Sequence, residues 1–305
     1  MHAIPRSILA MSLLMSAAGP ATADAHADCN NSADPKAQIS GCTAMLGTSA
    51  IPHDNAITYY LRANAYYTLQ DMGNALKDYS QSIQLDPSAP ACQGRGNVEI
   101  TTGELDTAVA DFTHALDLEP EMADAFALRA LAKNRLGDIP AAMVDIQKAF
   151  DIGWTTKSQA ADWYGIAGNI RMAQRNFPKA INNFEHALEN APNSPSLLNE
   201  LAWAQMVSDN TADALPNIQA ALSAAPDDPT FIDTQAHVLM KLGQADNAHD
   251  AFLRAMKLGR SDIVKGYQTG LASLNFFHGE ANGVFGDDSD RALRACIAVK
   301  CRLQE

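Results

Sequence analysis

Five cysteines carry the most reactive side chains of this chain, and their spacing limits the chemistry that they can do. Cys29 and Cys42 lie near its start, Cys296 and Cys301 lie near its end, and Cys92 stands apart. Local disulfides of this kind staple the ends of a fold in an oxidising compartment. A zinc site or reactive thiols are the alternative, poorly supported because no CxxC motif occurs and the histidines are scattered. We predict that Cys29, Cys42, Cys296 and Cys301 are paired in disulfides and that no metal is bound. The sequence leaves the connectivity open, and Cys92 is expected to fill space in the core.

Arginine and aspartate recur together, sixteen residues apart, in the first half of the chain. The pairs are Arg62 with Asp78, Arg95 with Asp111, and Arg129 with Asp145. A charge that is buried without a partner is costly, so this co-occurrence predicts three partly buried ion pairs. The alternative is that the arginines form a ligand clamp, but the accompanying aspartates would neutralise it.

No arrangement typical of a catalytic or cofactor site occurs. The sequence has no glycine-rich phosphate loop, no HExxH and no GxSxG motif. Its carboxylates are spread along the chain, which gives no reason to expect a pair poised for acid–base chemistry. Asp287, Asp288 and Asp290 lie close together, but they lack the spacing and the final glutamate of a calcium loop, so a helix cap is favoured. We predict a non-enzymatic protein without a cofactor.

Composition and charge restrict the partners further. The chain of 305 residues is 47% hydrophobic and 19% charged, which is typical of a folded protein. Its formal net charge is −13 at pH 7, so nucleic acid, which needs a basic face, is not an expected partner. An acidic chain suits a basic or neutral ligand better.

The first 27 residues have the composition of a secretory signal peptide. Arg6 precedes an apolar stretch at residues 8–15, and small-residue exits end at Ala23 and Ala27. This stretch is too short to span a bilayer, which takes about 20 residues, and no later stretch is long enough. We predict cleavage after Ala23 or Ala27 and a periplasmic or secreted protein. The alternative is a buried N-terminal helix.

The middle of the chain repeats one unit six times. An alanine followed four residues later by a large apolar residue recurs at intervals of 33 to 38 residues. The pairs are Ala75/Tyr79, Ala108/Phe112, Ala142/Ile146, Ala180/Phe184, Ala214/Ile218 and Ala248/Phe252. Another small residue lies twelve residues before each alanine. Small residues let two helices approach closely while a large residue fills the space between them, so the pattern predicts helix–turn–helix units.

These features resemble the tetratricopeptide repeat family, in six copies over residues 56–260. The resemblance implies an all-α fold, a right-handed superhelix (α-solenoid) of about six helix–turn–helix repeats. A helix within residues 28–55 is expected to cap its start, and a small helical unit, residues 261–305, follows. The third copy lacks its closing proline and is followed by four extra residues around Gly153–Ser158, which predicts a joint between copies three and four.

The resemblance also implies a concave groove, lined by the first helix of every repeat, in which a peptide or protein partner lies. Judged by their positions in the repeats, the residues expected to line this groove are Tyr60, Asn64, Tyr67, Gln93, Asn97, Asn134, Asn169, Asn199, Trp203 and His237. Amides both donate and accept hydrogen bonds, which suits an extended peptide backbone. The alternatives are that the asparagines only solvate an exposed face and that Trp203 packs between copies. The groove lacks the Lys and Arg cluster that would grip a C-terminal carboxylate.

The repeat pattern stops after Arg260, and residues 258–301 resemble the small peptidoglycan-binding domain of cell-wall hydrolases. The matching residues are Gln268, Leu271, Gly279, Asn282-Gly283-Val284-Phe285-Gly286 and Ala292-Leu293, with Asn282 where aspartate is usual. The resemblance implies that Phe277, His278, Asn282 and Phe285 contact peptidoglycan. The alternative is that this unit only caps the exposed apolar end of the repeats.

These predictions describe an exported helical scaffold that localises a partner near the cell wall if its C-terminal unit binds peptidoglycan. Two other functions stay open. One is a regulator or accessory subunit of a cell-wall enzyme, and the other is a structural assembly protein without affinity for the wall.

Overall fold

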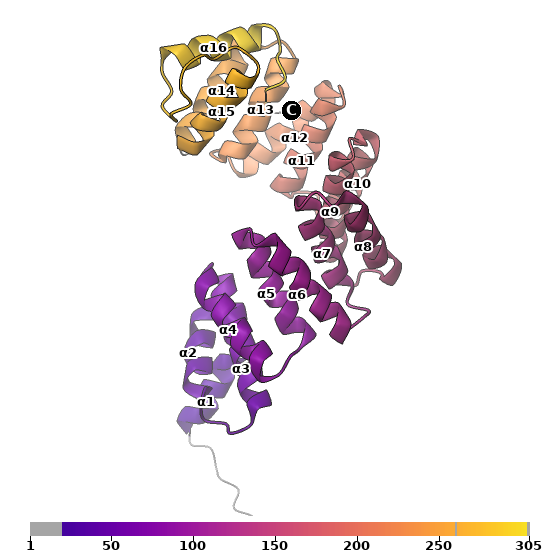
Figure 1. The fold of residues 1–305 in the computed structure, drawn as a ribbon, viewed down its shortest axis with the longest axis vertical. Coiled ribbons are helices and arrows are strands. Elements are labelled where there is room, and N and C mark those ends of the chain that lie inside the picture. Colours follow the sequence, from indigo (N-terminus) through magenta and orange to yellow (C-terminus); the bar gives the residue numbers. More distant parts are fainter. Residues whose placement is uncertain (1–19, 260, 304–305) are drawn as a thin grey trace, which may run out of the picture. The chain divides into compact units, whose positions relative to one another are not determined.

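The computed structural model describes residues 20–259 and 261–303, and in this part of the chain all regular structure is helical (Figure 1). The helices are numbered α1 to α16 along the chain, and each repeat forms a helix–turn–helix pair whose two helices pack against each other. The predicted all-α fold of repeated helix pairs is thereby confirmed. The chain divides into two compact units between Pro120 and Glu121.

The first unit contains three helix pairs, in which each helix packs against its neighbour in the chain. The pairs are α1 (Pro20–Cys29) with α2 (Pro35–Met45), α3 (Pro52–Thr68) with α4 (Met72–Leu85), and α5 (Ala89–Thr102) with α6 (Leu105–Leu118). The sequence predicts one capping helix before the repeats, whereas the structure has two. The first of them, α1, begins inside the segment expected to be a signal peptide, of which residues 1–19 lie outside the described residues.

The helices α1 and α2 form a tight hairpin. A disulfide between Cys29 and Cys42 joins them. Gly41 lies where they cross, because a methyl group there would come within 2.5 Å of the carbonyl oxygen of Ala25 and of the backbone nitrogen of Cys29. The side chain of Asp34 accepts hydrogen bonds from two backbone N–H groups of the first turn of α2 and so starts that helix.

The second unit contains four repeats and two further helices. They are α7 (Ala123–Arg135) with α8 (Ile139–Ile152), α9 (Lys157–Ala173) with α10 (Phe177–Asn190), α11 (Pro195–Val207) with α12 (Thr211–Ala224), α13 (Pro229–Lys241) with α14 (Ala245–Leu258), and then α15 (Ser261–Ser273) and α16 (Asp287–Ala298). The second helix of every repeat, in both units, is 14 residues long. This regularity is what the spacing of the sequence predicts.

The repeating residues of the sequence form the core. The six alanines have no exposed surface, and the six large residues paired with them are at most 2% exposed. Two of the earlier small residues are glycines that lie against these rings. A methyl group on Gly168 would come within 2.5 Å of the Phe184 ring, and one on Gly96 within 2.9 Å of the Phe112 ring.

The four extra residues after the third copy do not separate two blocks of the fold. Trp163 and Gln159 of α9 donate hydrogen bonds from Nε1 and Nε2 to the carboxylate of Asp124 in α7, at 3.1 and 2.9 Å. Trp154, from the extra residues, packs edge-on against Trp163. These contacts hold the third and fourth copies in one unit, and the division of the chain lies one copy earlier, after Pro120.

The last two helices close the end of the sixth repeat. Tyr267 of α15 packs edge-on against Phe252 of α14, with 5.6 Å between ring centroids. One cluster of buried side chains continues from Ile232 in α13 to Leu303 beyond α16. A second disulfide joins Cys296 to Cys301 at the end of α16. This packing is what a terminal cap of a repeat array requires.

Candidate functional site

Three arginine–aspartate pairs connect the two helices of the first three repeats. Each arginine donates from Nε and Nη2 to the two oxygens of its aspartate, and the aspartates are 3–9% exposed. The two distances are 2.6 and 2.9 Å for Arg62 and Asp78, 2.6 and 2.7 Å for Arg95 and Asp111, and 2.8 and 2.8 Å for Arg129 and Asp145. In forked pairs of this kind the carboxylate neutralises the guanidinium, so the pairs connect helices and do not present a ligand clamp.

The first two of these arginines also reach the preceding helix pair. Arg62 Nη1 donates to the hydroxyl of Thr43 in α2 at 2.9 Å, and Arg95 Nη1 donates to the hydroxyl of Ser80 in α4 at 3.2 Å. Each guanidinium therefore links three helices, which fixes how one repeat sits on the one before it within the first unit.

Glu99 of α5 lies beside the second pair. Its Oε2 is buried and has no hydrogen-bond partner among the described residues. Burial and the neighbouring Asp111 carboxylate raise the pKa of Glu99 to about 7, although Arg95 and a hydrogen bond with Thr107 oppose this rise. The carboxyl group is therefore protonated in the folded protein over a pH range in which an exposed glutamate is ionised.

We expect Glu99→Gln to raise the melting temperature at pH 8 and to leave it nearly unchanged at pH 5. The folded state binds the Glu99 proton more tightly than the unfolded chain, whose pKa is near 4.5. The stability linked to this proton is complete below about pH 4.5 and is lost as the pH rises through about 7. Above that pH the wild type buries a charge that glutamine lacks. Thermal unfolding at both pH values checks this, with Glu185→Gln, an exposed change on α10, as the control; equal shifts at pH 5 and pH 8 would contradict it.

In the first unit the predicted groove residues are half-buried on the first helices of two repeats. They are Tyr60, Asn64 and Tyr67 on α3, and Gln93 and Asn97 on α5. The hydroxyl of Tyr79 donates to Asn64 Oδ1 at 2.5 Å, so this amide is bound within its own repeat. In the next repeat Phe112 stands in place of the tyrosine, and Asn97 Oδ1 is enclosed without a partner among the described residues.

In the second unit the predicted groove residues differ in their exposure. Asn134, Asn169 and Trp203 are half-buried, whereas Asn199 and His237 are buried. The imidazole of His237, which is 1% exposed, lies edge-on between Trp203 and Phe252, with 5.4 and 5.0 Å between ring centroids.

His237 therefore belongs to the core and not to a groove surface. Burial, aided by the nearby Lys241 ammonium, lowers the pKa of His237 to about 4, so the ring is neutral. One helical turn earlier on α13, Asp233 accepts a hydrogen bond from the hydroxyl of Tyr267 in α15, and burial raises the pKa of that carboxyl to about 7. The tyrosine thus covers the first helix of the last repeat.

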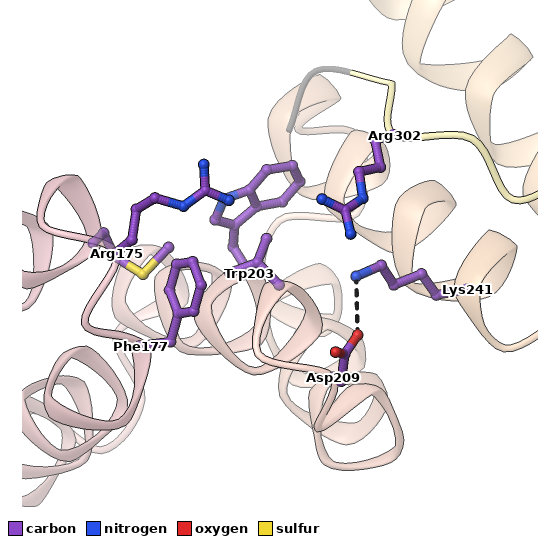
Figure 2. A pocket seen from close by; sticks show the side chains of 8 residues that line it. Arg175, Phe177, Trp203, Asp209, Lys241 and Arg302 are labelled. Atoms are coloured by element: carbon purple, nitrogen blue, oxygen red, sulfur yellow. Dashed lines mark ion pairs between the residues drawn. The ribbon is translucent and has the colours of Figure 1, made fainter.

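Three first helices of the second unit contribute to a pocket around Trp203 (Figure 2). We call it the Trp203 pocket, and its volume is about 380 Å³. Its lining residues are Met172, Arg175, Phe177, Trp203, Val207, Asp209, Lys241 and Arg302. They come from α9, the turn after it and the start of α10, from α11 and the turn after it, from the end of α13, and from the tail after α16. Figure 2 shows Arg175, Phe177 and Trp203 on one side and Asp209, Lys241 and Arg302 on the other.

The charged groups of the Trp203 pocket are held by its own walls. The Arg175 guanidinium lies over the Phe177 ring, 6.0 Å from the centroid. Lys241 Nζ donates to the carbonyl oxygen of Met206 at 3.0 Å and lies 3.6 Å from a carboxylate oxygen of Asp209. The pocket thus combines aromatic and aliphatic walls with three cations and one carboxylate, a composition that suits a ligand with apolar and anionic parts.

Only Trp203 of these lining residues was predicted from the sequence. The expectation that the groove has no Lys and Arg cluster concerns the repeat positions compared in the sequence, and the cations of this pocket come from other positions. Arg175 comes from a turn and Arg302 from the tail after the last helix. The sequence contains one indication of this pocket. Val207 lies one helical turn after Trp203, and Lys241 lies one helical turn after His237, so Val207 and Lys241 occupy the same repeat position on the face expected to line the groove.

Three of the four residues expected to contact peptidoglycan serve the fold. Phe277 is buried in the core of the cap, and Phe285 is half-buried against it. Asn282 Oδ1 accepts a hydrogen bond from the backbone N–H of Val284 at 2.9 Å, which closes a turn of the loop. His278 alone of the four has a side chain that is both exposed and not engaged in packing this loop.

Gln268 of α15 holds the same loop from inside. Its Nε2 donates to the carbonyl oxygen of Val284 at 2.9 Å and to Ser289 Oγ at 3.0 Å, and its Oε1 accepts from the N–H of Gly283 at 2.9 Å. Gln268 and Asn282, which carry part of the resemblance in this segment, therefore hold the loop in its conformation.

Cys92 lies near a histidine that the sequence pattern did not place beside it. Its Sγ is 3.7 Å from His114 Nδ1, but the thiol is fully buried and burial raises the pKa of Cys92 to about 11. A nucleophilic cysteine requires a lowered pKa and access, so this pair has neither property. Among the described residues no group of three or more His, Cys, Asp or Glu side chains could hold a metal ion, and no described helix is long and apolar enough to cross a membrane.

Comparison with known proteins agrees with the repeat pattern. Sequence profiles described as tetratricopeptide repeat match residues 56–88, 94–154 and 167–229, which together cover about half of the chain. Rat serine/threonine-protein phosphatase 5 is 29% identical over 126 residues, 41% of this chain and 25% of that protein. The human mitochondrial import receptor subunit TOM70 is 26% identical over 219 residues, 67% of this chain and 35% of that protein. The chain thus matches only a quarter to about a third of the length of these relatives.

Solved structures show the same fold at low sequence identity. A tetratricopeptide repeat protein from Parabacteroides merdae has a TM-score of 0.63 at 14% identity, covering 78% of this chain and 92% of that one. PilF from Pseudomonas aeruginosa has a TM-score of 0.56 at 17% identity, covering 68% and 93%. The chain has six helix pairs whose buried core combines small and large residues, and the family profiles match about half of the length of the chain. This chain is therefore a member of the tetratricopeptide repeat family.

Proposed function

We propose that this chain is a non-enzymatic scaffold that binds an extended segment of a partner protein on the first-helix face of its second unit. The observation that carries the proposal is the Trp203 pocket, because three successive first helices contribute to it and its lining combines aromatic side chains with cations. Aromatic and arginine side chains dominate the binding energy of protein interfaces. Relatives named as an Hsp70-Hsp90 organizing protein and a mitochondrial import receptor subunit support a role in contacts between proteins.

A photo-crosslinking amino acid in the pocket tests this proposal. Placed at Val207, it should form an adduct with a partner in the cells that produce the protein, and adding Trp203→Ala should remove the adduct. The control position is Val144 on the second helix α8, whose side chain is 62% exposed and lies outside the pocket. An adduct that survives Trp203→Ala, or that forms equally from Val144, would place the partner elsewhere. An adduct with a cell-wall enzyme would assign the role of an accessory subunit.

We also propose that the protein is exported. The apolar stretch at residues 8–15 supports export, as do the two local disulfides, which persist in oxidising compartments. One disulfide joins α1 to α2, and the other ties the tail to α16.

We expect the exported chain to begin at Asp24. Cleavage after Ala27 would remove most of α1, including the Ala25 carbonyl that lies against Gly41, and would leave the α2 side of the hairpin uncovered. Cleavage after Ala23 keeps this contact. The intact mass of the protein isolated from its cells distinguishes the two sites, and a chain that begins at Asp28 would contradict the expectation.

Attachment to peptidoglycan is the second candidate function. It is favoured by a cavity of about 360 Å³ in the cap, whose rim includes Phe276, His278 and Arg291. Co-sedimentation with purified sacculi tests it, using the full mature chain and a His278→Ala/Arg291→Ala variant. Both residues are exposed, so the variant keeps the fold, whereas removing the unit would uncover the core of the sixth repeat. If the mature chain stays in solution, α15 and α16 act as a cap only, and if the variant pellets as the mature chain does, this cavity is not the contact with the wall.

A further inference from the structure

We infer that the Trp203 pocket selects a peptide segment in which an acidic side chain lies next to a large apolar side chain. This inference rests on the proposed function and adds the chemistry of the bound segment. It differs from the expectation of a basic or neutral ligand that the overall charge suggests.

The local charge of the pocket opposes the charge of the chain. The chain has a formal net charge of −13, yet Arg175, Lys241 and Arg302 line one pocket with a single carboxylate, Asp209. The Asp209 side chain is 93% exposed, so water screens its effect, whereas the Lys241 side chain is only 21% exposed. A half-buried cation beside apolar walls interacts with an anion more strongly than a solvated one does.

The apolar walls require more than an anion. Trp203, Phe177, Met172 and Val207 line the pocket beside the cations. A small inorganic anion would pair with the cations but would leave these apolar walls exposed to water. A peptide that places a large apolar side chain next to an acidic one would meet both, and aromatic anchors of this kind dominate peptide recognition.

The backbone at the rim gives an independent argument. In each of the six repeats one residue of the turn between the two helices has a positive φ. They are Gln70 (61°), Gly103 (90°), Gly137 (85°), Arg175 (56°), Asp209 (66°) and Gly243 (79°). Glycine adopts this conformation without strain, whereas arginine does not. Three repeats have a residue other than glycine at this strained position, and in two of them that residue, Arg175 or Asp209, lines the Trp203 pocket. Backbone strain of this kind is concentrated at binding sites.

The tail brings the third cation. Lys300 Nζ donates to the carbonyl oxygen of Lys241 at 2.9 Å, and Leu303 is buried in the core of the cap. Both contacts fasten the tail on either side of Arg302, and the disulfide from Cys301 to Cys296 ties it to α16. Arg302 is thus brought to the pocket by a tail that is fastened both to α13 of the last repeat and to the cap.

Selection from random peptides tests the inference without knowledge of the partner. Heptapeptides displayed on phage are selected on the full mature chain, and we expect sequences with Asp or Glu next to Phe, Leu, Ile or Trp to be enriched at least about fivefold over the starting library. An enriched peptide with both ends blocked should bind at least about tenfold more tightly than its analogue with Gln or Asn in place of the acid, which is about 1.4 kcal/mol. Blocking the ends excludes recognition of a terminal carboxylate.

Arg175→Gly separates a binding role from a structural one. The change relieves the strained turn, so the variant should melt at a higher temperature while it binds the enriched peptide at least about fivefold more weakly. Gln70→Gly is the matched control, because it relieves the same turn in the first repeat and should leave binding unchanged.

The outcomes that overturn the inference are distinct from those that overturn the proposed function. No enrichment of acidic residues, equal affinity of the acidic and amide peptides, or full binding by Arg175→Gly would each overturn the inference. If the Val207 adduct still forms and depends on Trp203 in such a case, the pocket binds its partner by apolar contacts alone. If the adduct also fails, the scaffold proposal is overturned with it.

Discussion

Asp145→Ala is expected to lower the free energy of unfolding by about 3 kcal/mol. The Asp145 carboxylate accepts hydrogen bonds from Arg129 Nε and Nη2 and from Lys133 Nζ, all at 2.7 to 2.8 Å. Alanine would remove the carboxylate that Arg129 and Lys133 share, while their side chains stay only 15% and 20% exposed. Removal of one partner of a buried pair costs more than the pair contributes, because the remaining charge stays desolvated. Denaturant unfolding followed by circular dichroism measures the loss.

The chain itself offers the control for this prediction. At the corresponding positions the fifth repeat has Leu201 and Asn217. The double change Arg129→Leu/Asp145→Asn copies that pair and removes the arginine together with its partner. The amide oxygen of the new asparagine can still accept a hydrogen bond from Lys133. We expect it to cost clearly less than Asp145→Ala alone. If the two variants lose equal stability, the ion pair is not the reason why both residues are present.

Gly168→Ala is expected to destabilise the protein by about 2 kcal/mol, although alanine favours helices by about 1 kcal/mol over glycine. The added methyl group would lie within 2.5 Å of the Phe184 ring, which has no exposed surface. Overpacking therefore outweighs helix propensity at this position. Gly266→Ala in α15 is the matched control, because a methyl group there meets nothing within 4 Å, and it should stabilise the protein.

A second change should restore what Gly168→Ala loses. The third and fifth repeats pair alanine with isoleucine, as Ala130 with Ile146 and Ala202 with Ile218. Gly168→Ala/Phe184→Ile reproduces that pairing in the fourth repeat and should recover most of the lost stability. If the double variant is no more stable than Gly168→Ala, the ring is not what excludes the methyl group.

The repeat core could be predicted from the sequence because its residues recur. The alanine at the start of each second helix and the large residue four positions later face the same neighbours in every copy, so six weak signals add up to one strong one. The arginine–aspartate pairs were predictable for the same reason, since their joint presence and joint absence are visible without a structure.

The Trp203 pocket was predictable only in part, because its residues do not recur. Arg175 depends on the conformation of one turn, and Arg302 depends on how the tail is fastened over α13. The Phe252 ring that packs against His237 also packs against Tyr267, which lies outside the repeats. The periodicity of the sequence indicates the contacts that recur from one repeat to the next. It carries no information on the helices and the tail that cover the sixth repeat.

The burial of Cys92 protects the two disulfides from exchange. Cys29, Cys42, Cys296 and Cys301 are bonded in pairs, so Cys92 is the one cysteine of the sequence that remains a thiol. Disulfide exchange requires a thiolate that can reach the sulfur under attack. A pKa of about 11 and complete burial remove both conditions while the second repeat is folded. Scrambling of the disulfides can therefore begin only from a chain in which that repeat has opened, and the rate at which Cys92 reacts with a thiol reagent measures how often this happens.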